Sequence, residues 1–301
     1  RAADPLLAFP AGLDDLAALE AALVADPDDA RAHGYLGCWL MDAGRTADAL
    51  VALETAIGGG ERACTDPVVW RNAAVALVNT AGDLAEADRR YGVALALSPG
   101  DARLVYERDQ LAAVREMSAA DRLAAIEAAG PAVLVRDDLA ISHANLLVDV
   151  GRARDALTFL EGRSFQPFEG GEGQVISVFD RASAAVARDL LAAGDAAAAI
   201  ALLEGGVRVP EHLGEGRHPA DVIAERFVLL GQAYAAAGDH ESARAAWRRA
   251  RDGGGPLAAG EHTVSARDAW IGTAHTLLGE TDAADRVWAA LDARADALDA
   301  A

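Results

Sequence analysis

The sequence has 301 residues, of which 52% are hydrophobic but only 5% aromatic, so small apolar side chains supply much of its potential core. Its 47 acidic residues outnumber 27 basic ones, all of which are arginine, and the formal net charge is −20. A chain this acidic repels nucleic-acid phosphates and anionic membranes, which excludes both as default partners. The absence of lysine also excludes Schiff-base chemistry and P-loop phosphate binding.

From the N-terminus onward, apolar residues recur at helical spacing and predict paired helices, with no strand pattern anywhere. The first helix, Leu13 to Pro27, is predicted to be the second helix of a hairpin whose first helix is missing or irregular. Seven predicted hairpins follow, at about 30–57, 67–99, 101–129 (degenerate), 137–160, 177–204, 221–251 and 265–299. Three inserted loops separate the later hairpins, at 161–174, 205–220 and 252–263.

One pattern of small and large residues recurs in six of these hairpins. It is clearest at Gly231, Gly238, Ala243 and Trp247, where the last three positions follow the first by 7, 12 and 16 residues. The first small residue lets two helices approach, the second glycine ends the first helix with a positive φ, and the large residue fills the gap. The same spacing begins at Gly37, Ala144, Ala187 and Gly272, and with one extra residue in its turn at Ala74.

This pattern resembles the tetratricopeptide repeat (TPR), which has a period of about 34 residues and the same glycine, alanine and aromatic signature. The resemblance covers nearly the whole chain. It implies an all-α fold, a single right-handed TPR-like superhelical solenoid of about six to seven helical hairpins spanning residues 1–301, with the first helices lining a concave face.

The three inserted loops are predicted to be neighbours in space. The small residues of successive hairpins lie 43, 44 and 41 residues apart from Ala144 to Gly272, whereas the spacing inside each hairpin is constant. The surplus therefore falls between hairpins, and loops at equivalent points of a solenoid stack on one edge. The predicted rim residues are Glu169, Gly170, Gly171, Glu172, His212, Glu215, Arg217, His218, Glu261 and His262.

A narrower resemblance rests on "RSFQPFEGGEG", "PEHLGEG" and "DARLVYERDQL". These segments are similar to the C-terminal TPR region of large bacterial proteins whose N-terminal half is a β-rich domain of unknown function, related to sugar-binding β-sandwiches. The family's first loop usually reads His-Pro-Trp, where this sequence has Gln166 and Phe168. A function of that histidine would therefore be missing here. The resemblance implies a carbohydrate connection and an N-terminal partner domain, but it supplies no reaction.

The first inserted loop has four physical interpretations. Glycine-rich turns form anion-binding nests, and the carboxylates of Glu169 and Glu172 are able to accept hydrogen bonds from sugar hydroxyls or to act as acid and base. A solvated acidic turn at the edge of the solenoid is the alternative, because loops are commonly polar. With the family resemblance, a packing or docking role is favoured over catalysis.

The concave groove is predicted to be mostly neutral. The side chains expected to line it are Cys38, Arg71, Val75, Asn79, Asn145, Arg188, Gln232 and Thr273. TPR grooves that clamp a peptide carboxylate depend on basic residues, and this lining is short of them. A scaffold that holds a folded domain is therefore favoured over a receptor for peptide tails.

Other chemistry is not indicated. His212 and His218, with the nearby Glu211 and Glu215, match no strong metal motif, and no catalytic residue, metal or cofactor is predicted. Two cysteines, Cys38 and Cys64, are too few for a disulfide scaffold and are expected to be reduced, as in a cytoplasmic protein. No signal peptide or membrane span is recognisable, and the composition suggests a GC-rich bacterium. The first residue is Arg1 rather than Met, which leaves open whether the chain is a fragment of a longer protein.

The predicted function is a scaffold for protein–protein or interdomain interaction rather than an enzyme. Its expected partner is a protein, in particular the β-rich and carbohydrate-related N-terminal domain of its own parent, with carbohydrate as a further partner class. The alternative is an accessory part of a glycan-processing enzyme, in which the acidic rim loops complete the site.

Overall fold

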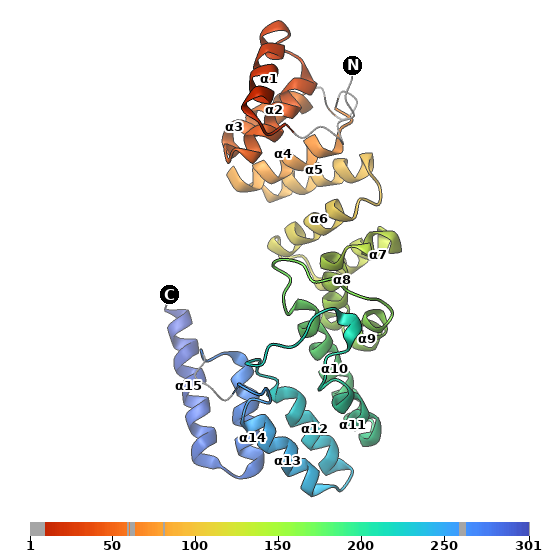
Figure 1. The fold of residues 1–301 in the computed structure, drawn as a ribbon, viewed down its shortest axis with the longest axis vertical. Coiled ribbons are helices and arrows are strands. Elements are labelled where there is room, and N and C mark those ends of the chain that lie inside the picture. The colour runs from red at the N-terminus through yellow and green to blue at the C-terminus, as the bar shows by residue number, and fades with distance from the viewer. Residues whose placement is uncertain (1–9, 59, 61–63, 81, 259–262, 301) are drawn as a thin grey trace. The chain divides into compact units, whose positions relative to one another are not determined.

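A computed structural model describes residues 10–58, 60, 64–80, 82–258 and 263–300. Every regular element among these residues is a helix, which confirms the predicted all-α class (Figure 1). None of the helices built from them has the length and apolarity needed to cross a membrane. The chain divides into two compact units, and the boundary falls after Ala140.

The N-terminal unit consists of helical hairpins preceded by one further helix. The elements are α1 (Leu13–Ala25), α2 (Ala30–Asp42), α3 (Thr46–Ile57), α4 (Pro67–Thr80), α5 (Leu84–Leu97), α6 (Ala102–Val114), α7 (Ala119–Ala128) and the 3-10 helix η2 (Pro131–Val135). Helix α1 has no buried residue, but its N-cap carbonyl, Gly12 O, accepts a hydrogen bond of 3.0 Å from Trp39 Nε1 of α2.

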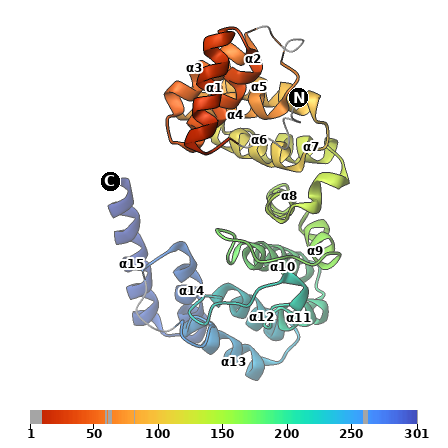
Figure 2. The same cartoon turned by 45° about the horizontal axis from the view of Figure 1, so that its top comes forward.

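The C-terminal unit carries the long inserted loops. Its elements are α8 (Asp137–Asp149, in which the boundary lies), α9 (Ala153–Glu161), α10 (Gln174–Ala192), α11 (Ala196–Gly205), η3 (Glu211–Leu213), α12 (Ala224–Ala236), α13 (His240–Arg251), η4 (Ala266–Asp268), α14 (Ala269–Leu278) and α15 (Thr281–Asp299). Paired helices such as α14 and α15 lie side by side in both views (Figures 1 and 2).

The turns inside the hairpins depend on glycine. The glycine that the repeat pattern places after the first helix has a positive φ in all six hairpins: Gly44, Gly82, Gly151, Gly194, Gly238 and Gly279, with φ between 66° and 83°. Side chains other than glycine rarely adopt this conformation, so glycine ends one helix and allows the next to return. An aspartate often starts the second helix, as at Asp239, whose carboxylate accepts the Ser242 amide at 3.0 Å.

Close helix approach in three of the hairpins requires glycine at the first small position, where the other three hairpins carry alanine. A Cβ atom at Gly37 would lie 2.5 Å from Leu53 Cγ, and one at Gly272 would lie 2.9 Å from the Trp288 ring. At Gly231 a Cβ atom would overlap with the Trp247 indole. These are the pairs of small and large residues that the repeat pattern places opposite each other.

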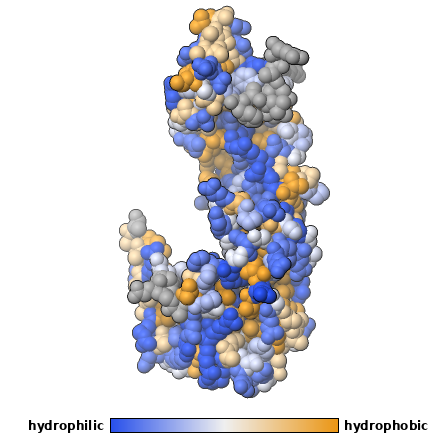
Figure 3. Space-filling model, viewed as in Figure 1, coloured by the Kyte–Doolittle hydropathy of each residue, from blue (hydrophilic) through white to orange (hydrophobic). Residues whose placement is uncertain are grey.

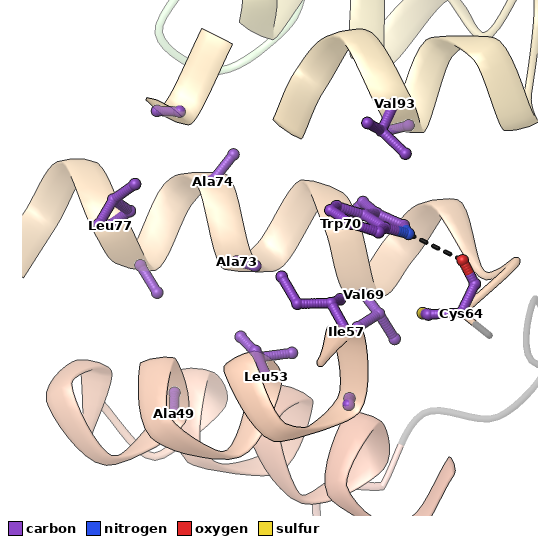
Figure 4. Packing of buried hydrophobic residues seen from close by; sticks show 14 of the residues in the cluster. Ala49, Leu53, Ile57, Cys64, Val69, Trp70, Ala73, Ala74, Leu77 and Val93 are labelled. Carbon is purple, nitrogen blue, oxygen red and sulfur yellow. Dashed lines mark hydrogen bonds between the residues drawn. The ribbon is translucent and has the colours of Figure 1, made fainter. Parts of the chain in front are cut away.

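The core of the N-terminal unit is built from aliphatic residues and tryptophan. Leu53 and Ile57 of α3 face Val69, Trp70 and Ala73 of α4 (Figure 4). The indole Nε1 of Trp70 donates a 2.9 Å hydrogen bond to the carbonyl of Cys64. Neither Cys64, which is buried, nor the half-buried Cys38 forms a disulfide, and burial raises the pKa of both thiols.

A buried arginine links three helices of this unit. The Arg90 side chain, 6% exposed, donates to Glu86 at 2.9 Å within α5 and to Glu54 of α3 at 2.6 Å. It also reaches the Ala73 carbonyl of α4. Hydrogen bonds from Arg89, followed by those from Arg90, lower the pKa of Glu86 from 4.5 to about 2.

This lowered pKa predicts a specific acid sensitivity. A carboxyl group with a lower pKa in the folded state stabilises the fold above its unfolded pKa, and this stabilisation is lost as the pH falls from about 4.5 to about 2. We therefore expect Glu86→Gln to destabilise the protein by about 1 kcal/mol at pH 7, a value limited by partial solvent exposure. The difference should shrink toward zero as the pH approaches 2.

Urea unfolding of both proteins between pH 7 and pH 2.5 measures this difference. The matched control is Glu20→Gln, because Glu20 is exposed on α1 and takes part in none of the ion pairs of the described residues. Its pH profile should run parallel to that of the unmodified chain. A constant difference for Glu86→Gln across the pH range would contradict the assigned role of the carboxylate.

Candidate functional site

The first inserted loop, residues 162–173, folds tightly between α9 and α10. The Gly171 amide donates to the Phe168 carbonyl at 3.0 Å, and the phenyl ring of Phe168 covers Gly171 so closely that a Cβ atom there would overlap with it. Positive φ angles occur at Gly170 (81°) and Gly173 (75°) but not at Gly171. Gly171 is therefore required for space, whereas its two glycine neighbours are required for backbone conformation.

The second inserted loop, residues 206–223, is attached directly to the first. The Phe165 amide donates to the His212 carbonyl at 2.9 Å, and the Gly173 amide donates to Glu215 Oε2 at 2.8 Å. A Cβ atom at Gly214 would overlap with the Phe165 carbonyl oxygen, so the two backbones meet without a side chain between them. Together these contacts, between residues more than 40 positions apart in the sequence, hold the two loops as one surface.

The third inserted loop continues this contact. The Ile223 amide donates to the Gly253 carbonyl at 2.8 Å, and the Leu257 amide donates to the Pro219 carbonyl at 3.0 Å. The structure thus brings the described parts of all three inserted loops together in the C-terminal unit. The predicted rim residues Glu261 and His262 lie outside the described residues.

A buried charge cluster fixes the second loop to the helices beneath it. Asp180 of α10 accepts two hydrogen bonds from Arg217 of the loop, at 2.5 and 2.9 Å, and one from Arg226 of α12 at 2.8 Å. The side chains of Arg217 and Arg226 are only 11% and 4% exposed. A Cβ atom at Gly206 would overlap with the Arg226 guanidinium, so this glycine provides its space.

The predicted rim residues therefore separate into two groups. Glu169, Glu172 and His218 are exposed, and the two glutamates take part in none of the ion pairs of the described residues. Glu215 and Arg217 are instead half-buried and hold the loops together. His212 is also half-buried, and no group of His, Cys, Asp and Glu that is suited to a metal occurs among the described residues.

The predicted groove residues are distributed over both units. In the N-terminal unit, Arg71 forms a two-pronged ion pair with Glu107 at 2.6 and 2.7 Å, and Asn79 is exposed. In the C-terminal unit, Arg181 donates to Asn145 at 2.6 Å, Arg188 pairs with Glu225, and Gln232 is exposed.

An open cleft of about 520 Å³ lies over α10 and α12 in the C-terminal unit. Asp180 and Glu225 form part of its wall, and Arg267 and Trp270 contribute from η4 and α14. Arg188 lies over the Trp270 ring, with 5.5 Å from its guanidinium carbon to the ring centre. Hydrophobic and hydrophilic areas alternate over the face of the molecule shown in Figure 3.

Sequence reasoning missed the residues that join the loops to the helices, namely Asp180, Arg226, Phe165 and Gly214. A signal for some of them was present. Arg217 and Asp180 are 37 residues apart, Arg181 and Asn145 are 36 apart, and Arg71 and Glu107 are 36 apart. A search for polar partners about one repeat apart would have found these contacts.

Solved structures similar to this chain include tetratricopeptide repeat proteins of low sequence identity. No family model matches the sequence. A tetratricopeptide repeat protein from Parabacteroides merdae is 15% identical, with 87% of this chain and 91% of that chain covered and a TM-score of 0.40. YrrB, described as a TPR protein with an unusual peptide-binding site, is 14% identical, with coverage of 78% and 92% and a TM-score of 0.42. The Naa15/Naa10 complex bound to HypK-THB gives 15% identity and a TM-score of 0.49, over 91% of this chain and 41% of the matched chain.

Proposed function

We propose that this chain is an interaction scaffold and that the outer face of its first two inserted loops docks a folded partner domain. The expected partner is the β-rich, carbohydrate-related domain of the same parent protein, as implied by the "RSFQPFEGGEG" and "PEHLGEG" segments. One observation carries the proposal: the backbone of these loops is fixed by contacts within the chain, while Glu169 and Glu172 are exposed and outside the ion pairs of the described residues.

A loop held in one conformation is better suited to docking a partner domain than a flexible loop. Binding by a flexible loop must overcome the entropy of ordering it, and a loop already held in one conformation avoids that cost. Here the Phe165–His212 and Gly173–Glu215 hydrogen bonds supply the order before any partner arrives. The exposed carboxylates then present a fixed pattern of hydrogen-bond acceptors to the partner.

The groove residues support a scaffold over a receptor for a peptide carboxylate. Arg71, Arg181 and Arg188 are each bonded to an acidic or amide side chain of the same unit. A peptide carboxylate would have to displace these partners before it could bind. The exposed carboxylates of the rim have no such competitor among the described residues.

A binding titration tests the docking face. The separately expressed remainder of the parent protein is titrated into this chain by calorimetry. Glu169→Gln combined with Glu172→Gln should weaken the affinity at least tenfold, about 1.4 kcal/mol, and leave the melting temperature unchanged. Glu215 is left intact in this variant because it holds the Gly173 amide.

The control removes two exposed carboxylates elsewhere in the same unit, by Glu241→Gln with Asp285→Asn, and thus makes the same change in net charge. Equal affinities of the two double variants would reject the loops as the docking face. A different result would favour the glycan-processing alternative. In that case this chain mixed with the remainder of the parent protein hydrolyses glycan, and the Glu169→Gln, Glu172→Gln variant still binds but no longer supports hydrolysis.

A further inference from the structure

A second concave site lies beyond the docking face, between the second and third inserted loops. It is a pocket of about 600 Å³ in the C-terminal unit. Backbone at Gly214 and Gly216 forms one wall, and backbone at Gly254 and Gly255 forms another. Of these four glycines, only Gly216 has open space where a Cβ atom would lie, so a ligand can approach its backbone closely.

Two arginines of the lining have no carboxylate partner within the described part of the chain. Arg208 and Arg249 both line the pocket, and neither takes part in the ion pairs of the described residues. Arg249 is held over the Phe227 ring, 4.2 Å from its guanidinium carbon to the ring centre, and its Nε is 3.4 Å from the Gly254 carbonyl oxygen.

Further donors come from the second loop. His218 Nδ1 accepts the Ala220 amide at 3.2 Å, so the neutral ring carries its proton on Nε2 and offers a donor there. The guanidinium of the lining residue Arg217 is already bonded to Asp180, so it stabilises the loop rather than offering donors to the pocket.

The two acidic residues of the lining differ in how strongly they oppose an anion. Glu215 is half-buried, its Oε2 accepts the Gly173 amide of the first loop, and its buried Oε1 has no donor among the described residues, so this carboxylate disfavours an anion beside it. Glu211 is exposed to solvent, where water and salt screen its charge. Basic residues in the last turn of α13 also stabilise the end of that helix, but this explanation does not extend to Arg208, which lies in the loop.

We propose that this pocket binds an oxyanion group, a carboxylate or a phosphate, through Arg208 and Arg249. The planar guanidinium presents paired donors that match both kinds of group. The proposal is independent of the docking of a partner domain, because the pocket lies between the second and third loops and uses neither Glu169 nor Glu172.

Calorimetric titrations of the whole chain with inorganic phosphate and with succinate, at constant ionic strength, test the proposal. We expect saturable binding of at least one of them. Phosphate alone would assign a phosphate ligand, succinate alone a carboxylate ligand, and both an unselective oxyanion site. The absence of saturable binding by either would overturn the proposal.

Substitutions then locate the site. Arg208→Gln should weaken the binding at least fivefold without affecting the fold, because Arg208 is exposed and its guanidinium makes none of the hydrogen bonds of the described residues. Arg249→Gln should also weaken the binding at least fivefold. Because this substitution removes the contact of Arg249 with the Phe227 ring, the melting temperature of the variant is measured as well. Arg244→Gln is the control, since Arg244 is exposed on the same helix and does not line the pocket. Equal binding by all three variants would place the anion elsewhere and refute the assignment.

Discussion

Asp180→Ala should lower the free energy of unfolding of the C-terminal unit by about 3 kcal/mol, the lower end of the range for removing one partner of a buried ion pair, because the Asp180 side chain is itself 27% exposed in an open cleft. Asp180 is the shared acceptor for Arg217 and Arg226, whose side chains are 11% and 4% exposed. Without the carboxylate, two guanidinium groups would stay buried beside each other with no counterion. The expected loss is large because it consists mainly of the cost of these unpaired charges, rather than of the hydrogen bonds alone.

A second substitution separates this cause from simple loss of packing. Arg226→Met in the Asp180→Ala background removes one of the two unpaired charges and keeps an apolar side chain of similar length. We expect it to restore part of the lost stability, because buried ion pairs can often be replaced by hydrophobic residues. The remaining hydrogen bond from Arg226 to the Leu203 carbonyl, 3.0 Å long, would be lost in exchange.

Asp189→Ala is the matched control on the same helix. Asp189 is exposed and outside the ion pairs of the described residues, so its loss should change stability by no more than about 0.5 kcal/mol. Chemical denaturation followed by far-UV circular dichroism measures all of these variants. If Asp180→Ala lowers the free energy of unfolding no more than Asp189→Ala does, the buried cluster does not fix the second loop.

The helical hairpins were predictable because their signal is local and repeated. A glycine that must adopt a positive φ and a small residue that must face a large one leave a fixed spacing in the sequence. Gly238 has φ 83°, and Gly231 faces Trp247, as the pattern requires. The proximity of the inserted loops was also predictable, since insertions at equivalent points of successive repeats fall on one edge.

The contacts that attach the loops to each other and to the helices could not be predicted from a repeated local pattern. Gly214 meets the Phe165 carbonyl backbone to backbone, and such a contact leaves no periodic trace in the sequence. Asp180 is one of 47 acidic residues, and nothing local distinguishes it from exposed ones such as Asp189. The role of Gly171 was likewise open, because the sequence shows a glycine but not whether it serves conformation or space.

The division into two units after Ala140 also has no marker in the sequence. It falls within α8, between helical turns of ordinary composition, rather than at a linker rich in proline or glycine.

Trp247→Ala is expected to destabilise the C-terminal unit by about 3 kcal/mol. This is the lower end of the range for replacing a tryptophan by alanine in a core, because the indole is only partly buried. The ring covers Gly231 of α12, and its Nε1 lies 3.4 Å from the Val228 carbonyl oxygen. Its loss would open a cavity between α12 and α13 that rigid helices cannot fully close.

The last hairpin provides a matched comparison for this effect. Trp288 of α15 covers Gly272 in the same relation, but it is 37% exposed at the edge of the unit. Since more of its surface already contacts solvent, Trp288→Ala should cost about half as much in unfolding free energy. Gly231→Leu alone should destabilise the unit, because the new side chain would overlap with the indole. In the Trp247→Ala background the same substitution should restore part of the lost stability, because the leucine side chain would fill the cavity that the indole leaves. Urea denaturation of the four proteins in this cycle measures the coupling between positions 231 and 247. Additive effects of the two substitutions would mean that these residues do not share one space, and the repeat register would then be wrong for this hairpin.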